Sequence, residues 1–382
     1  MAEPAPAEAH AAPASYPTQI TPLIGLRFFA LAWVILNQFR FHLDLHAGDR
    51  SGIVFKGYLG AALFFVLTGF LTAHLFTTDR ADGRFRYGAS LWAKLAGFYP
   101  LHLAAIAAMG GLLIAGHAIG APPPQGLFDA KSIAANLGLV QAWGVMPTVS
   151  WNFPSWLISA EWFAALAFPL TAWIALGRIN PVAVIAVALA SFATMFEIAD
   201  YHHVLFTDMT AQIGALQTVP AFLFGAGLYA FGRRASLPGG WAKPLAALAA
   251  AWIVAAALMR LSDLAIWPVF GVLVFALAET SKTPKPALSQ PAVLYLGAAA
   301  MSLYLVYLPV DIAYFHGVER LVGTPTGARA WAVWAGVFPV ILAVGLVAYQ
   351  LITRPAAAWL EAHSPFALLA RRIARPAETP AT

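Results

Sequence analysis

Long apolar runs recur along almost the whole chain, separated by short polar segments. A helix needs about 20 mainly apolar residues to cross the hydrocarbon core of a bilayer. Ten runs reach or approach that length, and each predicts a membrane-spanning helix. They lie at 22–42, 57–76, 99–119, 156–176, 182–199, 212–232, 245–261, 265–279, 293–314 and 330–352.

One further apolar stretch, residues 133–145, is too short to span comfortably and leaves an interfacial or re-entrant helix as its expected form. The positions of basic residues indicate whether this stretch crosses the membrane, because cytoplasmic loops carry an excess of Lys and Arg. The basic segment 77–94 is expected in the cytoplasm. If 133–145 does not span, the chain has ten spans and every later basic cluster also faces the cytoplasm. If it does span, the later clusters face outward. The sequence therefore predicts ten spans, both termini cytoplasmic and 133–145 outside. The residues concerned are Arg80, Arg84, Arg86, Lys94, Arg233, Arg234, Lys243, Lys282, Lys285, Arg371, Arg372 and Arg375.

The composition agrees with a bilayer environment. Of 382 residues, 60% are hydrophobic and only 10% are charged, whereas soluble proteins carry about 25% charged residues. A soluble enzyme is therefore excluded, and the predicted class is an all-α integral membrane protein. The net charge of +5 fits basic cytoplasmic loops better than nucleic-acid binding. Without cysteine there is no disulfide, thiolate nucleophile or Cys-ligated metal, and no metal site is expected.

The domain organisation is simple. Residues 1–20 are rich in Ala, Pro and Glu and lack the features of a cleaved signal, which predicts a disordered tail. Residues 21–360 form one transmembrane domain, and 361–382 form a basic cytoplasmic tail. The chain shows no phosphate loop, nucleotide fingerprint or solenoid repeat.

The first predicted span carries two polar residues that a bilayer disfavours, Arg27 and Gln38. They are eleven residues apart, which is about three helical turns, or roughly 16 Å of rise, on nearly one face. A polar stripe thus runs from the inner to the outer half of this helix. Arg27 either extends to the cytoplasmic headgroups or faces a ligand, and both interpretations stay open.

Three other polar residues extend this pattern. Glu161 falls in the outer half of its predicted span and needs a proton, a cation or a hydrogen bond to a neighbouring helix. Tyr307 also falls in an outer half. Lys94 lies at an inner end, where it either anchors the interface or meets an anionic ligand. Together with Arg27 and Gln38, these positions predict an outer polar chamber and an inner basic mouth. That arrangement fits a protein that links a cytoplasmic anion to an external acceptor, and also a transporter.

Seven segments, in this order and spacing, resemble the membrane acyltransferase family 3, whose members O-acylate bacterial surface glycans, some lipids and small molecules. The resemblance runs from about residue 20 to residue 360. The segments are IGLRFFA at 24–30, GYLGAALFFVLTGFL at 57–71, FYPL at 98–101, NFPSWLISAEW at 152–162, AFLFG at 221–225, LG at 296–297 and MSLYL at 301–305.

The resemblance implies a ten-helix core in the bacterial inner membrane. It also implies that acyl-CoA, acetyl-CoA above all, binds from the cytoplasmic side as donor. The acyl group then passes to a hydroxyl of a carbohydrate or glycolipid acceptor, near membrane lipid and polysaccharide synthesis or export proteins. By this resemblance Arg27 and Lys94 hold the donor, and Glu161 orients or charges the base.

The chain departs from the family at several chemical positions. The family histidine of the first helix, eleven residues after Arg27, is Gln38 here, and glutamine cannot act as a general base near neutral pH. A second family histidine falls on Tyr307. The arginine usual before Tyr-Pro is Gly97, and the usual Glu-Pro pair reads 354–355 as Arg-Pro.

His42 offers a replacement base, because it lies one turn beyond Gln38 on the same face if the helix continues. The alternative is an interfacial histidine that faces water or headgroups. The candidate catalytic residues are thus Glu161, His42, Gln38 and Tyr307. Three functions stay open: an active acyltransferase, a catalytically silent family member that binds glycan, lipid or a partner subunit, and a transporter. The transporter hypothesis ranks last, because the sequence lacks the paired intramembrane carboxylates of a proton relay and a clear inverted repeat.

Overall fold

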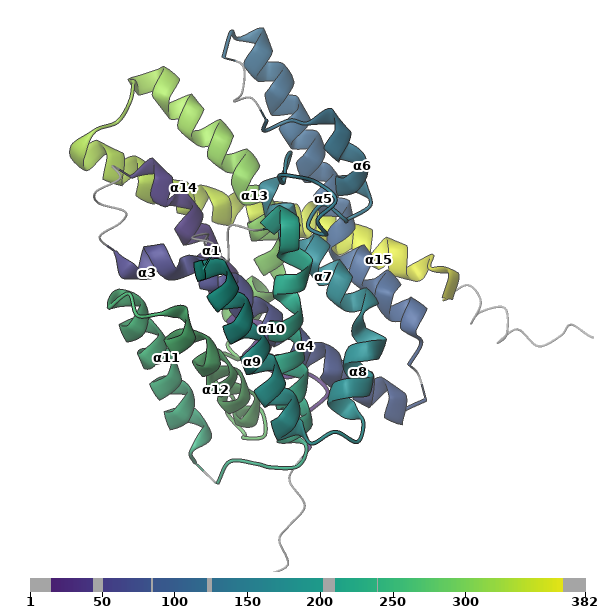
Figure 1. Cartoon of the computed structure of the whole chain (residues 1–382). Coiled ribbons are helices and arrows are strands. Elements are labelled where there is room, and N and C mark those ends of the chain that lie inside the picture. The colour runs from purple at the N-terminus through teal and green to yellow at the C-terminus, as the bar shows by residue number, and fades with distance from the viewer. Residues whose placement is uncertain are drawn as a thin grey trace, which may run out of the picture.

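The structure is a computed structural model. In the part of the chain that it describes, all regular secondary structure is helical (Figure 1). The expectations for residues 1–14, for Arg84 and for the basic positions beyond 366 lie outside that part. The described residues are 15–43, 51–83, 85–121, 126–201, 210–238 and 240–366.

Eight helical segments of the described chain are long and apolar enough to cross a membrane, and a bent pair makes a ninth. The pair is α7 and α8, which meet at 60°. A shorter apolar helix, α11, completes the correspondence with the ten predicted spans. The helices are α1 (Thr21–Gln38), α3 (Gly52–Phe55), α4 (Leu59–Ala81), α5 (Tyr87–Ala118), α6 (Ile133–Leu137), α7 (Trp156–Leu166), α8 (Phe168–Leu176), α9 (Pro181–Tyr201), α10 (Thr210–Gly232), α11 (Ala242–Leu258), α12 (Asp263–Thr280), α13 (Pro291–Val322), α14 (Gly327–Ala348) and α15 (Arg354–Ala362).

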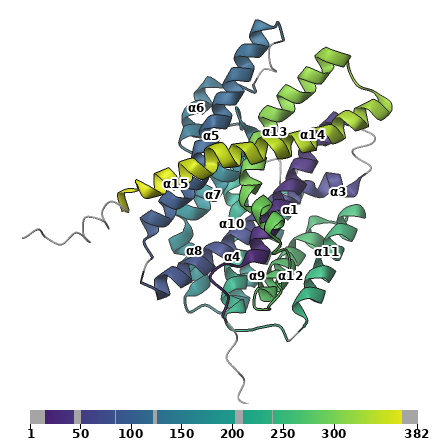
Figure 2. The same cartoon turned by 180° about the vertical axis from the view of Figure 1, so that it is seen from behind.

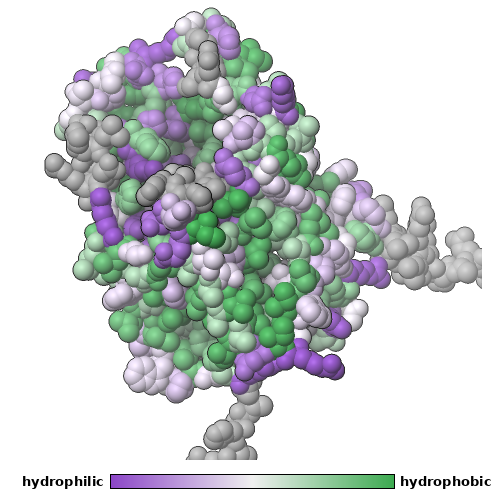
Figure 3. Space-filling view, in the orientation of Figure 1, coloured by the Kyte–Doolittle hydropathy of each residue, from purple (hydrophilic) through white to green (hydrophobic). Residues whose placement is uncertain are grey.

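The predicted class, an all-α multi-pass membrane protein, is therefore confirmed. Figure 3 shows hydrophobic side chains over the middle of one face and hydrophilic ones toward its two ends, as a bilayer belt requires. Figure 2 shows α14 and α15 running across the back of the bundle, joined by a π-helical turn. Several helices extend beyond the predicted limits. In particular, α5 begins at Tyr87, so Lys94 lies within a helix.

Residues 133–145 do not span, as predicted. Only α6 is helical there, and turns follow it. Part of the segment is nonetheless buried, at Asn136, Leu139, Gln141 and Ala142, and serines of α7 and its entry bond some of its polar groups. Ser159 Oγ donates to the carbonyl of Leu139, and Gln141 Nε2 donates to the carbonyl of Ser155 at 3.0 Å. Non-helical backbone at this depth is stable only when protein groups bond it in this way.

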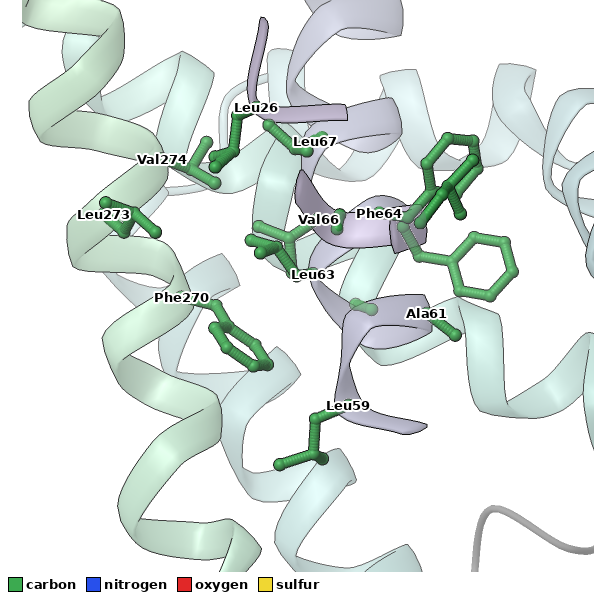
Figure 4. Packing of buried hydrophobic residues seen from close by; sticks show 14 of the residues in the cluster. Leu26, Leu59, Ala61, Leu63, Phe64, Val66, Leu67, Phe270, Leu273 and Val274 are labelled. Carbon is green, nitrogen blue, oxygen red and sulfur yellow. The ribbon is translucent and has the colours of Figure 1, made fainter. Parts of the chain in front are cut away.

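The core is built around α4, which packs closely on α10 and α1. Gly69 of α4 and Gly225 of α10 make this approach possible. A Cβ on Gly69 would overlap the carbonyl of Phe222, and one on Gly225 would overlap the carbonyl of Val66. Small residues allow such backbone contact between helices in a membrane. Figure 4 shows the adjoining layer, where apolar side chains of α4 face those of α12.

The chain entering α1 is anchored by Tyr16. Its hydroxyl donates to Glu279 Oε1 at 2.6 Å, and Lys282 Nζ lies 2.8 Å from the same oxygen. Burial, reinforced by the hydrogen bond to Glu279, raises the pKa of Tyr16 well above its ordinary value. This contact fixes the start of α1 against the end of α12.

Gly225→Val tests the α4–α10 contact. We expect it to destabilise the protein by about 1–3 kcal/mol, because the added carbons must displace the backbone of α4. The readout is the apparent Tm of the purified protein in detergent. Gly111→Val is the matched control, since a Cβ on Gly111 meets nothing within 4 Å. Equal Tm values for the two variants would contradict the close packing.

Candidate active site in two cavities

The first cavity, here the basic cavity, has a volume of about 440 Å³. It lies between α1, α4, α5, α7 and α13 and contains three of the sequence-predicted residues, Arg27, Lys94 and Glu161. Asp79 and Thr68 of α4 also line it. Arg27 and Lys94, the two residues expected to form the basic mouth, therefore line the same cavity.

Lys94 and Glu161 form an ion pair in this cavity, with 2.7 Å between Nζ and Oε1. The Glu161 side chain is 9% exposed and that of Lys94 is 20% exposed. Of the three alternatives open for Glu161, a proton, a cation or a hydrogen bond to a neighbouring helix, the structure supplies the cation. Glu161 belongs with the basic mouth and not with the outer chamber, which corrects the placement made from sequence depth. The reason is that α7 is a short arm ending at Leu166, and Lys94 sits inside α5.

Arg27 faces the same cavity from α1. Its Nε is buried and has no hydrogen-bond partner among the described residues. The helix is held tightly just before this residue, because a Cβ on Gly297 of α13 would overlap the carbonyl of Ile24. A buried donor on a fixed backbone favours a ligand-facing role for Arg27 over extension to the headgroups.

The second cavity, here the aromatic cavity, has a volume of about 320 Å³. Gln38, the last residue of α1, lines it. Arg40, Asp263 and Gln217 also line it. Most of the remaining wall is aromatic. It consists of Phe41, Phe55, Tyr58, Phe65, Phe153, Trp156, Phe192 and Trp267, with Val34, Asn37, Leu59, Ala61, Ala62 and Thr210.

Asp263, which sequence analysis missed, is held in this wall by two neighbours. Lys56 Nζ lies 2.5 Å from Asp263 Oδ1, and the Tyr58 hydroxyl lies 2.9 and 3.0 Å from its two oxygens. Both charged side chains are about nine-tenths buried. The signal was present, since Lys56 and Asp263 each adjoin a long apolar run. Neither falls within a predicted span, because those spans begin one or two residues later.

His42 lies elsewhere. The α-helix ends at Gln38 and continues as a 3₁₀ turn, Phe39–His42, which rotates the later side chains away from the α-helical face. The expected alignment of His42 with Gln38 is therefore absent. His42 Nε2 lies 2.6 Å from Asp311 Oδ1, and its ring stacks on Phe315 with centroids 3.5 Å apart. His42 does not line the aromatic cavity.

Tyr307 is buried in the core of α13 and lines neither cavity. Its ring packs edge-on against Phe39 and Tyr304, at centroid distances of 6.0 and 5.5 Å. The Tyr307 hydroxyl has no hydrogen-bond partner within the described chain. The structure thus gives Tyr307 a packing environment shared with the turn that carries His42, and no access to Gln38.

An aromatic partition separates the two cavities. Phe64 lines the basic cavity, whereas the next residue, Phe65, lines the aromatic cavity and meets Trp156 edge-on at 6.1 Å. Arg27 and Gln38 stand on either side, on the single helix α1. No histidine in the described ranges lines either cavity. Nor do the described residues contain a group of three His, Asp or Glu that could hold a metal.

Lys94→Met tests the ion pair. It leaves the buried Glu161 carboxyl without its ion-pair partner, and we expect a cost on the order of 3 kcal/mol. The double variant Lys94→Met with Glu161→Gln removes the uncompensated charge and should recover most of that loss. Apparent Tm values of the single and double variants in detergent check this. A double variant as unstable as the sum of the two single changes would show that the side chains act independently.

The chain matches a family model described as an acyltransferase domain over residues 21–350. Acyltransferase MdmB of Streptomyces mycarofaciens is 32% identical over 170 residues, which cover 43% of this chain and only 41% of that protein. Protein 2 in picA locus of Rhizobium radiobacter is 32% identical over 155 residues, 39% of this chain and 76% of that protein. No solved structure matches. Because the family model covers most of the 382 residues, this chain belongs to the acyltransferase 3 family of membrane proteins.

Proposed function

We propose that this protein is an inner-membrane O-acyltransferase that moves an acyl group, most simply acetyl, from acyl-CoA to a hydroxyl of a cell-envelope or exported glycan. The observation that carries the proposal is the pair of cavities on α1, with Arg27 in one and Gln38 in the other. The cavity that contains Arg27 can then receive the donor, and the cavity that contains Gln38 can receive the acceptor. The name of the Streptomyces relative, an acyltransferase, supports the reaction type.

The basic cavity suits the donor. Arg27 presents a buried, unpartnered donor nitrogen, and Lys94 adds a cation held in place by Glu161. Charged donors bind phosphate and thioester oxygens with strong hydrogen bonds. With both termini in the cytoplasm, this cavity opens toward the cytoplasmic pool of acyl-CoA, in line with the positive-inside rule.

The aromatic cavity suits a hydroxylated acceptor. Gln38 and Asp263 supply hydrogen-bonding groups, and the surrounding rings supply flat apolar surfaces for a sugar face. The indole nitrogen of Trp267 is buried there without a hydrogen-bond partner among the described residues, so an acceptor oxygen would satisfy it. Enzymes that polymerise or export polysaccharide are the partners that would deliver such an acceptor.

The proton of the acceptor hydroxyl needs a base, and Gln38 cannot take it. We assign that role to His42, with Asp311 orienting its imidazole. The assignment requires the acceptor hydroxyl to lie beyond Gln38, toward the 3₁₀ turn. Tyr307 then supports the turn through Phe39 and does not contact the reacting atoms.

A second candidate function has its own support. Because no described histidine lines either cavity, the protein would equally serve as a silent family member that binds glycan, lipid or a partner subunit. The two functions differ in turnover and not in ligand binding. Activity therefore has to be measured alongside affinity.

The direct test uses the purified protein in nanodiscs with labelled acetyl-CoA and a glycan acceptor. We expect slow transfer by the wild type, whose base His42 lies outside the aromatic cavity, and faster transfer by Gln38→His, which places a base on the cavity wall. Gln212→His is the matched control, on an exposed position of α10. Donor binding with no turnover in either the wild type or Gln38→His would favour the silent function.

His42→Ala tests the assigned base. Transfer should fall by about a hundredfold or more while donor affinity stays unchanged, because His42 lies outside the basic cavity. His316→Ala controls for loss of a histidine on the exposed part of α13. Equal transfer rates in the two variants would remove His42 from the mechanism.

A further inference from the structure

A third cavity adjoins the basic cavity. This arginine pocket, with a volume of about 790 Å³, lies between α4, α8 and the end of α10. Arg80 and Arg233 supply its two cations. The wall between it and the basic cavity is common to both and is aromatic throughout. The shared residues are Phe76, Phe85, Tyr87 and Phe168.

The shared wall is ordered by its own contacts. Phe76 meets Phe85 and Phe168 edge-on, at centroid distances of 4.6 and 5.3 Å. The Tyr87 hydroxyl donates to the carbonyls of Ala165 and Leu166, at the break between α7 and α8. The bend between these helices therefore opens the arginine pocket and ties it to the arm that carries Glu161.

The side chain of neither arginine forms an ion pair or hydrogen bond with a residue that the structure describes, although their backbones are bonded. Arg80 lies over the ring of Phe76 at 5.8 Å, and Arg233 directly follows α10. Both are near helix C-termini, where a cation is favourable without any ligand. What distinguishes them is that two separate helices bring both into one concave, aromatic-lined space.

The charges of the two cavities together favour an anion larger than one phosphate. Their lining holds four cations, Arg27, Lys94, Arg80 and Arg233, against two carboxylates, Asp79 and Glu161. Glu161 is already paired with Lys94. A ligand with phosphates in the arginine pocket and a neutral arm in the basic cavity would match this distribution of cations and carboxylates.

We propose that the arginine pocket binds the nucleotide end of the acyl donor, with its phosphates on Arg80 and Arg233 and its purine against the aromatic wall. The thioester arm then passes the shared wall into the basic cavity, toward Arg27. This inference rests on the proposed function, since it assumes a donor of the coenzyme A type. Flat aromatic surfaces such as Trp173 and Phe168 are suited to stack a base.

A phospholipid headgroup offers the same phosphate chemistry, and Trp173 is 71% exposed on the outside of the bundle. The shared wall favours the donor, because a headgroup alone would leave no reason for four residues to line both cavities. The experiment therefore includes a lipid arm.

The full-length protein is placed in neutral phosphatidylcholine nanodiscs, and the binding of coenzyme A, adenosine 3′,5′-bisphosphate and pantetheine is measured by calorimetry. Each of Arg80→Gln and Arg233→Gln should weaken the first two ligands by roughly tenfold, and leave pantetheine unchanged. Arg80→Lys with Arg233→Lys should recover part of the loss. Arg234→Gln, next in sequence but outside the pocket, is the matched control.

Three results would overturn the inference. Coenzyme A affinity unchanged in the Arg80→Gln, Arg233→Gln double variant would remove the pocket from donor binding while leaving the proposed transfer intact. Absence of bisphosphate binding by the wild type would do the same, whatever its activity. Arginine-dependent retention of phosphatidylglycerol in mixed nanodiscs, with no bisphosphate binding, would assign the pocket to a lipid headgroup.

Discussion

The cost of charge inside an apolar bundle governs where this molecule keeps its polar residues. An unpaired ion in a helical membrane core is expensive, so buried charges pair with one another or face a cavity. Among the described residues three lysine–carboxylate pairs are largely buried, Lys94–Glu161, Lys56–Asp263 and Lys282–Glu279. Lys94 and Glu161 line the basic cavity and Asp263 lines the aromatic cavity, so at both cavities a buried ion pair adjoins open space.

The helix α1 connects these two places. Glycines of its neighbours hold it at backbone distance along its length. A Cβ on Gly57 would overlap the carbonyl of Trp33, one on Gly60 would overlap that of Ala30, and one on Gly297 would overlap that of Ile24. With its backbone held this closely, α1 presents Arg27 and Gln38 to separate cavities, and the rings of Phe65 and Trp156 complete the partition between them.

Much of the architecture could be predicted from sequence because hydrophobic length and loop charge report directly on the bilayer. The non-spanning character of 133–145 followed from the same reasoning. The site was harder. Depth along a span placed Glu161 with Gln38, whereas the short arm of α7 and the long start of α5 bring it to Lys94. Sequence spacing gives the rise along a helix, but not where one helix meets another.

The same limit explains the other differences. His42 was expected on the face of Gln38, yet the change to a 3₁₀ turn at Phe39 sends it to Asp311. Lys56 and Asp263 were missed because their partners lie about two hundred residues apart in sequence. Pairings of that kind depend on tertiary packing, which no local pattern contains.

The proposed function requires two separate cavities, one for the donor and one for the acceptor, that open toward opposite sides of the membrane. The chain contains no cysteine, so single cysteines report cleanly. Ser90→Cys marks the basic cavity and Phe41→Cys the aromatic cavity. In oriented vesicles, a membrane-impermeant maleimide should label them from opposite sides, and coenzyme A should protect only Ser90→Cys. Labelling of both from one side, or protection of Phe41→Cys alone, would contradict the account.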